Sequence, residues 1–371
     1  TFAEQPDGTL QQIVHRQGDV PWVPLDWRAL PAEEQQRQLQ RLIHDDRLQG
    51  YDLTHGPLLR VMLVRLAEEQ WWMGVGFHHL ILDGWSMGLL MRDLLAQYDT
   101  QPQESPAVSV LPYTEWCERQ DTTEARAFWR RMLQDATPTR VAHNAQGEPS
   151  YHEQQRQLSA ATTQELRQFA QQSHITLNTL VQGAVALLLH QLTRRHDVVL
   201  GVTQAGRPAE YAGAEAMVGM LANTLPLRVS LAGEQPLAAW LRELQLLQSE
   251  IAQYSFVSAE QVHEWANGEP QVPLFDTIVR FQNYPLQQSM WKRKQFQIHT
   301  IEWVDHWHYP LCFIVVPGET LSLSITYDRR SFNDLQINTI FDRFLSILST
   351  FSIHNGKSIR EVLELIDMVG V

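Results

Sequence analysis

Helix-forming and strand-forming patterns are interleaved through both halves of the 371-residue sequence, and this mixture restricts the possible folds more than any other feature. Helical spacing of apolar residues predicts helices over residues 31–48, 86–98, 123–133, 162–173, 176–195, 237–254 and 333–351. Short apolar runs predict strands over residues 57–65, 71–79, 197–203, 220–231, 275–281, 312–316 and 320–327. Because helices and strands mix without a regular alternation, we expect an α+β fold of two lobes rather than a doubly wound sheet.

A gap in the pattern separates the two predicted lobes. Residues 134–150 hold two prolines and Gly147 but few apolar side chains, which is typical of a linker. We therefore predict an N-terminal lobe over residues 1–135, a linker over 136–150 and a C-terminal lobe over 151–371. A chain of this length is sufficient for two separate cores.

Charge and cysteine content exclude several classes of function. The chain has 29 Lys and Arg against 42 Asp and Glu, giving a net charge of −13, which disfavours binding to a nucleic-acid backbone. Its only cysteines are Cys117 and Cys312, so the sequence contains no disulfide framework and no cysteine-based zinc site. No apolar stretch is long enough to span a bilayer. We expect a cytoplasmic protein that binds no membrane, nucleic acid or metal of its own.

The segment with the most chemical information is GFHHLILDGWS, residues 76–86. His78 and His79 end a predicted strand, and the Asp83-Gly84 turn leads into a predicted helix. Adjacent strand residues point to opposite faces, so one imidazole should face a cleft and the other the packed interior. Such a strand end is a frequent position for catalytic side chains.

The neighbouring residues have predicted structural roles. Ser86 is a candidate N-cap for the helix that follows, and Gly84 supplies backbone freedom in the turn. Asp83 is expected to hold the loop through an arginine, for which Arg60, Arg207 or an arginine N-terminal to Thr1 are candidates. From the residues alone, the histidine pair remains open to three interpretations: a structural pair, half of a metal site without a third ligand at a familiar spacing, or a catalytic site.

Four elements resemble those of one family, the condensation domains of non-ribosomal peptide synthetases within the chloramphenicol-acetyltransferase-like superfamily. The first is His78-His79-x-x-x-Asp83-Gly84, which resembles the HHxxxDG signature. Residues 111–116 (LPYTEW), 218–228 (VGMLANTLPLR) and 274–285 (LFDT continuing to NYP) resemble three further elements in the same order. The resemblance covers nearly the whole chain.

The resemblance implies two chloramphenicol-acetyltransferase-like lobes arranged as a V. It also implies that a further N-terminal segment normally precedes Thr1, so we expect the N-terminal lobe to be incomplete. The family's VGxFxNT element has Phe where this chain has Leu221, followed here by Ala222. Both departures are mild.

The implied reaction is amide bond formation in antibiotic or other secondary-metabolite biosynthesis. The amine of a carrier-bound aminoacyl thioester attacks a carrier-bound acyl or peptidyl thioester. The partners would be donor and acceptor peptidyl carrier proteins and neighbouring synthetase domains. The domain itself would need no cofactor, since phosphopantetheine is supplied by the carriers.

The resemblance also assigns roles to individual residues. His79 would orient the attacking amine and accept its proton, while His78, Asp83 and Gly84 of the signature would serve the structure of the site. Trp85, Ser86 and Asn283 are expected to contact substrate. For Asn283, a role as an ordinary turn residue remains equally open.

Residues in and near the signature distinguish condensing domains from related subfamilies. Heterocyclising domains replace the histidines with aspartates, and inactive recruitment domains alter the second histidine, whereas both are intact here. Epimerisation domains lack the DGWS and AGRP forms found at residues 83–86 and 205–208. Two alternatives stay open: an acyltransferase that uses free acyl-CoA, and a non-catalytic platform that recruits another enzyme to an assembly line.

Overall fold

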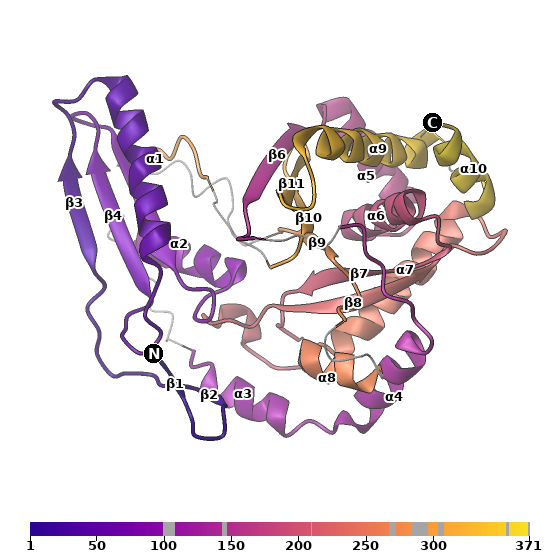
Figure 1. The fold of residues 1–371 in the computed structure, drawn as a ribbon, viewed down its shortest axis with the longest axis horizontal. Coiled ribbons are helices and arrows are strands. Elements are labelled where there is room, and N and C mark those ends of the chain that lie inside the picture. Colours follow the sequence, from indigo (N-terminus) through magenta and orange to yellow (C-terminus); the bar gives the residue numbers. More distant parts are fainter. Residues whose placement is uncertain are drawn as a thin grey trace. The chain divides into compact units, whose positions relative to one another are not determined.

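The computed structural model describes residues 1–98, 108–142, 147–208, 210–266, 272–283, 296–302, 308–353 and 356–369 (Figure 1). The chain forms two compact units. Unit 1 contains residues 1–87 together with Val218–Met220, and unit 2 contains residues 88–217 and 221–371. Each mixes helices with strands, so the predicted α+β class is confirmed.

Unit 1 is built on two small sheets and one long helix. Strands β1 (Phe2–Glu4) and β2 (Leu10–Gln12) form an antiparallel pair. Strands β3 (Trp22–Asp26), β4 (Leu59–Arg65) and β5 (Trp71–Phe77) form a second sheet, in which β4 pairs parallel to β3 and antiparallel to β5. Helix α1 (Ala32–Gln49) connects β3 to β4, and α2 (Gly84–Tyr98) begins at the end of this unit.

Alternation along β4 sets the inner face of the three-stranded sheet. Met62 and Val64 are buried, as is Leu58 just before the strand, and all three point to the same side. Buried Leu39 of α1 adds to this small core. The strands expected at 57–65 and 71–79 are confirmed, and they pair antiparallel.

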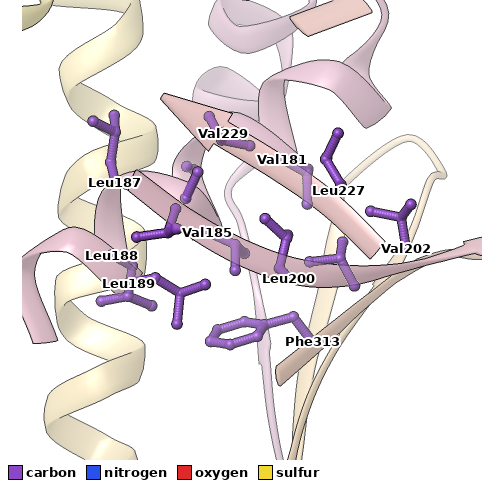
Figure 2. Close-up of a cluster of buried hydrophobic side chains, with 14 of the residues drawn as sticks. Val181, Val185, Leu187, Leu188, Leu189, Leu200, Val202, Leu227, Val229 and Phe313 are labelled. Atoms are coloured by element: carbon purple, nitrogen blue, oxygen red, sulfur yellow. The ribbon is translucent and has the colours of Figure 1, made fainter. Parts of the chain in front are cut away.

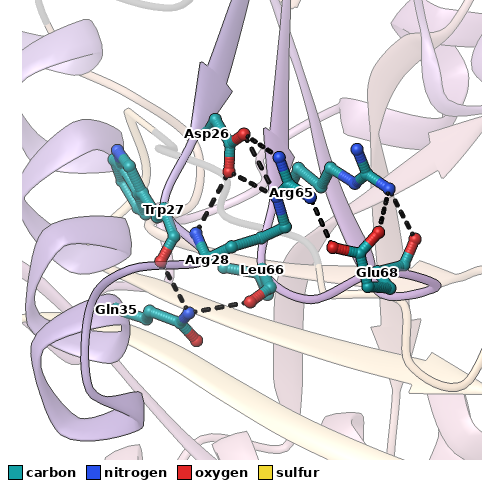
Figure 3. Close-up of polar contacts among 7 residues, drawn as sticks. All are labelled: Asp26, Trp27, Arg28, Gln35, Arg65, Leu66 and Glu68. Atoms are coloured by element: carbon teal, nitrogen blue, oxygen red, sulfur yellow. Dashed lines mark hydrogen bonds and ion pairs between the residues drawn. The ribbon is translucent and has the colours of Figure 1, made fainter.

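A polar cluster ties the start of α1 to the end of this sheet (Figure 3). The side-chain amide of Gln35 donates to the carbonyls of Trp27 and Leu66, at 2.9 Å in each case. Arg28 binds the carboxylate of Glu68 across the same end. These contacts fix the direction in which α1 leaves the sheet, since a bonded backbone carbonyl cannot move without losing its donor.

Unit 2 contains a mixed six-stranded sheet with the order β6-β11-β10-β9-β7-β8. Strand β9 pairs parallel with both β7 and β10, and the other pairs are antiparallel. The strands are β6 (Tyr151–Gln157), β7 (Asp197–Gln204), β8 (Asn223–Ser230), β9 (Thr277–Phe281), β10 (Leu311–Val316) and β11 (Ser322–Asp328). The helices are α3 (Leu111–Glu118), α4 (Thr122–Leu133), α5 (Ala160–Gln172), α6 (Leu177–Thr193), α7 (Leu237–Gln253), α8 (Ala259–Trp265), α9 (Asp334–Ile353) and α10 (Ile359–Val369).

Helix α6 is the centre of the unit 2 core. Residues 179–191 are all buried, which fits a helix that is apolar around most of its circumference. Figure 2 shows Val185 and Leu188 of α6 beside Leu200 of β7 and Phe313 of β10. The described part of the chain contains no single helix long and apolar enough to cross a membrane; α5 and α6 meet that test only as a pair bent by 102°.

Several elements were not predicted from the sequence. Helices α3 and α8 have only 8 and 7 residues, too few for a clear helical period. Strand β6 reads YHEQQRQ and lies at the edge of the sheet, so most of its side chains are exposed and polar. Helix α10 lies beyond residues 333–351, the last helix that the sequence predicts.

The contacts divide the chain at Met87, earlier than the predicted lobe boundary at 135. The physical reason is α4, whose buried residues belong to the main core of unit 2: Ala125, Phe128, Trp129 and Leu133. Part of the predicted linker is also held in unit 2, because Thr139 forms a bridge with Phe275. The division into lobes 1–135 and 151–371 stays a prediction.

We expect Leu188→Ala to destabilise unit 2 by about 2–5 kcal/mol, because the substitution leaves a cavity in a fully buried site. The measurement is urea unfolding of the purified chain. Leu246→Ala on α7 is the matched control, since Leu246 is 67% exposed and should change the unfolding free energy by less than about 1 kcal/mol. Equal effects of the two variants would contradict this account of the core.

Candidate active site

His78 and His79 lie where β5 ends and a tight turn begins. The backbone N–H of His78 donates to the carbonyl of Leu58 at 3.0 Å, which extends the sheet pairing by one residue beyond Phe77. The carbonyl of His78 then accepts the N–H of Ile81 at 3.1 Å. His79 is therefore the second residue of a four-residue turn, a position set by its neighbour.

The side chain of His78 closes the same turn. Its Nδ1 accepts the backbone N–H of Leu80 at 3.2 Å. An accepting Nδ1 has no proton, so the neutral ring carries its proton on Nε2. Burial, and the charge of His79 when protonated, lower the pKa of His78 below its ordinary value.

The two imidazoles contact different partners. The ring of His78 meets the ring of Tyr51 edge-on, with centroids 6.1 Å apart, whereas the ring of His79 meets that of Phe77 at 5.9 Å. Both histidines follow the end of β5 and His79 lies within the turn, so alternation along a strand does not explain these positions. That one imidazole faces a cleft and the other the packed interior stays a prediction.

Asp83 caps helix α2. Its carboxylate accepts the N–H of Ser86 at 2.8 Å, and the side chain is only 1% exposed. The prediction that Ser86 is the N-cap was wrong, because α2 begins at Gly84 and Asp83 accepts the free N–H of its first turn. Gly84 is thus the first residue of the helix and its backbone does not form a separate turn.

Ser86 is instead buried, and its hydroxyl forms hydrogen bonds with a residue far away in the sequence. Its hydroxyl donates to the carbonyl of Gly219 at 2.8 Å and accepts the N–H of Gly219 at 2.9 Å. The N–H of Asp83 donates to the same carbonyl at 3.2 Å. These bonds hold the segment Val218–Met220 within unit 1, although the residues on both sides of that segment belong to unit 2.

Other predicted residues have distinct positions. Arg60, considered as a partner for Asp83, forms its ion pair with Asp46, with Nε and Oδ1 3.0 Å apart. Trp85 is partly buried in the first turn of α2. Asn283 is exposed two residues after β9 in unit 2, and Tyr284 and Pro285 of the same element lie outside the described residues.

Two of the sequence elements have a structural role. The side chain of Asn223 donates to the carbonyls of Ser255 and Val257, at 3.2 and 2.7 Å, and so fixes the start of β8. The Asp276 carboxylate accepts the backbone N–H groups of Val141 and Ala142 at 2.8 and 2.7 Å. Burial raises the pKa of Asp276 despite these bonds.

Sequence reasoning missed Gly219, Tyr51 and Asp46 around the histidine turn. Gly219 is 133 residues from Ser86, and no local pattern links the two. The resemblance of residues 218–228 to a family element was the only available signal. Among the described residues, no group of three or more His, Cys, Asp or Glu could hold a metal ion.

Comparisons with known proteins give the family. A family model described as "Condensation domain" matches residues 1–367. Linear gramicidin synthase subunits C and D from Brevibacillus parabrevis are 35% and 32% identical over 95% and 94% of this chain. The chain spans only 5% and 7% of those two proteins.

Solved structures match the fold. The first condensation domain of the calcium-dependent antibiotic synthetase has a TM-score of 0.76 at 19% identity, covering 97% of this chain and 85% of that one. The X-domain from teicoplanin biosynthesis has a TM-score of 0.78 at 19% identity, covering 97% and 84%.

The chain therefore belongs to the condensation domains, acyltransferase-type enzymes that form amide bonds in non-ribosomal peptide synthetases. The family occurs in multidomain synthetases, where such a domain has neighbouring synthetase domains. The resemblance stated from the sequence is confirmed.

We expect Ser86→Ala to destabilise the fold by about 1–3 kcal/mol, because the buried N–H of Gly219 loses its acceptor. Chemical unfolding measures the change. Ser249→Ala is the matched control, since Ser249 is exposed on α7 and its hydroxyl donates along its own helix to the carbonyl of Gln245. A Ser86 variant as stable as the Ser249 control would overturn the role of this tie.

The lowered pKa of His78 predicts a pH dependence of stability. The unfolded chain takes up a proton near pH 6.5, while the folded chain resists it, so the unfolding free energy should fall as the pH drops below about 6.5. His78→Asn keeps an acceptor oxygen near the position of Nδ1 but cannot titrate. Urea unfolding between pH 5 and 8, roughly the range that brackets an ordinary histidine pKa, should show a weaker decline for His78→Asn than for the wild type. Parallel curves would refute the assignment.

Proposed function

We propose that His79 is the residue at which this domain joins its two substrates. The acceptor is a carrier-bound aminoacyl thioester, and its amine attacks the carbonyl of a carrier-bound acyl or peptidyl thioester. The carbon–nitrogen bond forms as the carbon–sulfur bond breaks, and the donor carrier's thiol is released. His79 orients the amine, accepts the proton that the amine loses and passes it to the departing thiolate, which leaves as the thiol.

The observation that carries this proposal is the anchored turn. His79 follows His78, which is bonded at its backbone N–H, its carbonyl and its ring. Buried Asp83 caps the helix that follows the turn. An anchored side chain can hold a reacting group in place without first paying the entropy of ordering itself. This supports a positioning role for His79, to which proton transfer adds roughly 10²–10⁴-fold in rate.

His78 has a different part in the proposal. Its Nδ1 accepts the N–H of Leu80, which leaves only the Nε2–H form of the neutral ring. A ring held neutral and bonded to its own turn is suited to shape the site and not to exchange protons. Asp83 and Gly84 start the helix behind the turn, and Trp85, Ser86 and Asn283 remain candidates for substrate contact.

The substrates would reach the site on tethers. Donor and acceptor peptidyl carrier proteins would each present a phosphopantetheine arm, so the domain would need no cofactor of its own. Tethering would raise the effective concentration of both thioesters, and well-oriented reactions of this kind gain several orders of magnitude in rate. We place the protein in the cytoplasm, where carrier-bound intermediates and reduced thiols coexist.

Two other functions would give different results in the same assay. An acyltransferase that uses soluble acyl-CoA would form product without a donor carrier. A recruitment platform would form none and would be indifferent to changes at His79. Both histidines of the signature are present, which favours the condensing enzyme over the platform.

The test is a single-turnover assay with acyl-loaded donor carrier and aminoacyl-loaded acceptor carrier, read by intact-protein mass spectrometry. We expect amide product with the wild type and a rate at least roughly a hundredfold lower with His79→Ala, because the variant loses the positioned base. His44→Ala on the exposed surface of α1 should leave the rate unchanged. Equal rates for wild type and His79→Ala would remove His79 from the reaction.

A further inference from the structure

A half-buried group of side chains lies beside the histidine turn and is made of Asp46, Tyr51 and Arg60 in unit 1. None of the three belongs to the HHxxxDG signature. Asp46 is in the last turns of α1, Tyr51 follows that helix, and Arg60 is in β4. The three side chains come together only because α1 crosses the inner face of the sheet.

Arg60 is the centre of this group. Its Nε lies 3.0 Å from Asp46 Oδ1 as an ion pair, and one terminal nitrogen donates to the carbonyls of Asp46 and Gly50 at 3.2 and 2.9 Å. The guanidinium carbon stands 4.2 Å above the centre of the Tyr51 ring. The side chains of Arg60 and Asp46 are only 17% and 16% exposed, so solvent screens their attraction less than it would at the surface.

Tyr51 connects Arg60 to the histidine turn. One face of its ring lies against Arg60, and its ring meets that of His78 at 86°. The Tyr51 hydroxyl is buried and makes no well-aligned hydrogen bond in the described part of the chain. The ring is the part of Tyr51 that contacts His78 and lies against Arg60.

Gly76 makes room for the group on β5, directly opposite Arg60 in the strand register. A Cβ at this position would lie 2.9 Å from Asp46 Oδ2 and 3.0 Å from the Tyr51 hydroxyl. Any larger residue would push Tyr51 or Asp46 away from the strand. The strand that carries His78 is thus shaped to accept Tyr51.

We propose that Tyr51, held by the Asp46–Arg60 pair, is a positioning residue that fixes the His78 ring and through it the turn carrying His79. This inference rests on the proposed function of His79. His78 accepts the N–H of Leu80 through its ring, so a ring free to rotate would release that bond and loosen the turn. Tyr51 acts through its contact with His78 and does not itself react.

Tyr51→Leu and Tyr51→Phe test the proposal as a matched pair. Leucine removes the ring, and the single-turnover rate at saturating carrier should fall about tenfold or more, with little change in the carrier concentration that gives half the maximal rate. Phenylalanine loses the hydroxyl but keeps the ring that contacts His78 and Arg60, so it should retain the wild-type rate. A loss of rate in both variants, or in neither, would overturn the proposal.

A spectroscopic measurement separates positioning from simple loss of stability. NMR of the histidine rings in the folded protein should show His78 as the Nε2–H form with a depressed pKa in wild type and Tyr51→Phe. In Tyr51→Leu, that pKa should move up towards the ordinary value of about 6.5, and the tautomer preference should weaken. An unchanged His78 signal in a folded Tyr51→Leu variant would refute the role. This readout needs no carrier, so it still tests Tyr51 if the wild type forms no amide.

Discussion

The buried bonds between Ser86 and Gly219 are the constraint on which the histidine site depends. One hydroxyl serves both polar groups of a single backbone residue, and all of these atoms are shielded from water. Shielding makes the bonds costly to break, because neither group of Gly219 can turn to solvent instead. The start of α2 is therefore fixed to a segment 133 residues further along the chain.

The Ser86–Gly219 bonds and the strand pairing of β5 hold the two ends of the loop that contains His79. His78 is bonded to Leu58 at the end of β5, and Asp83 caps α2 four residues after His79. Between these anchors, the loop has room for one turn, closed by the carbonyl and the ring of His78. In the proposed mechanism, which has no covalent intermediate, the rate comes from placing the reacting groups, so rigidity around His79 would be of direct chemical use.

Much of the fold could be predicted from hydrophobic periodicity. The long helices α1, α5, α6, α7 and α9 and most of the strands lie close to the expected ranges. Prediction failed for β6, α3 and α8. The edge strand β6 buries little side-chain surface, so its sequence lacks an apolar alternation. The short helices α3 and α8 depend on contacts with distant residues; in α3, for example, the Tyr113 hydroxyl donates to the carbonyl of Gly206. The predicted N-cap at Ser86 failed for a similar reason, since its hydroxyl is engaged with Gly219.

The sequence by itself determined the class of the protein, because the HHxxxDG signature and three further elements occur in order and each is a local string of residues. It also determined that His78 and His79 would stand at the end of a strand, because the strand-forming run over residues 71–79 ends before the Asp83-Gly84 turn. Only the tertiary structure decided which ring is bonded to its own turn, and that Tyr51, Arg60 and Asp46 lie beside it. These contacts join a helix, a loop and two strands, and no local pattern of residues encodes which side chains meet when such elements pack.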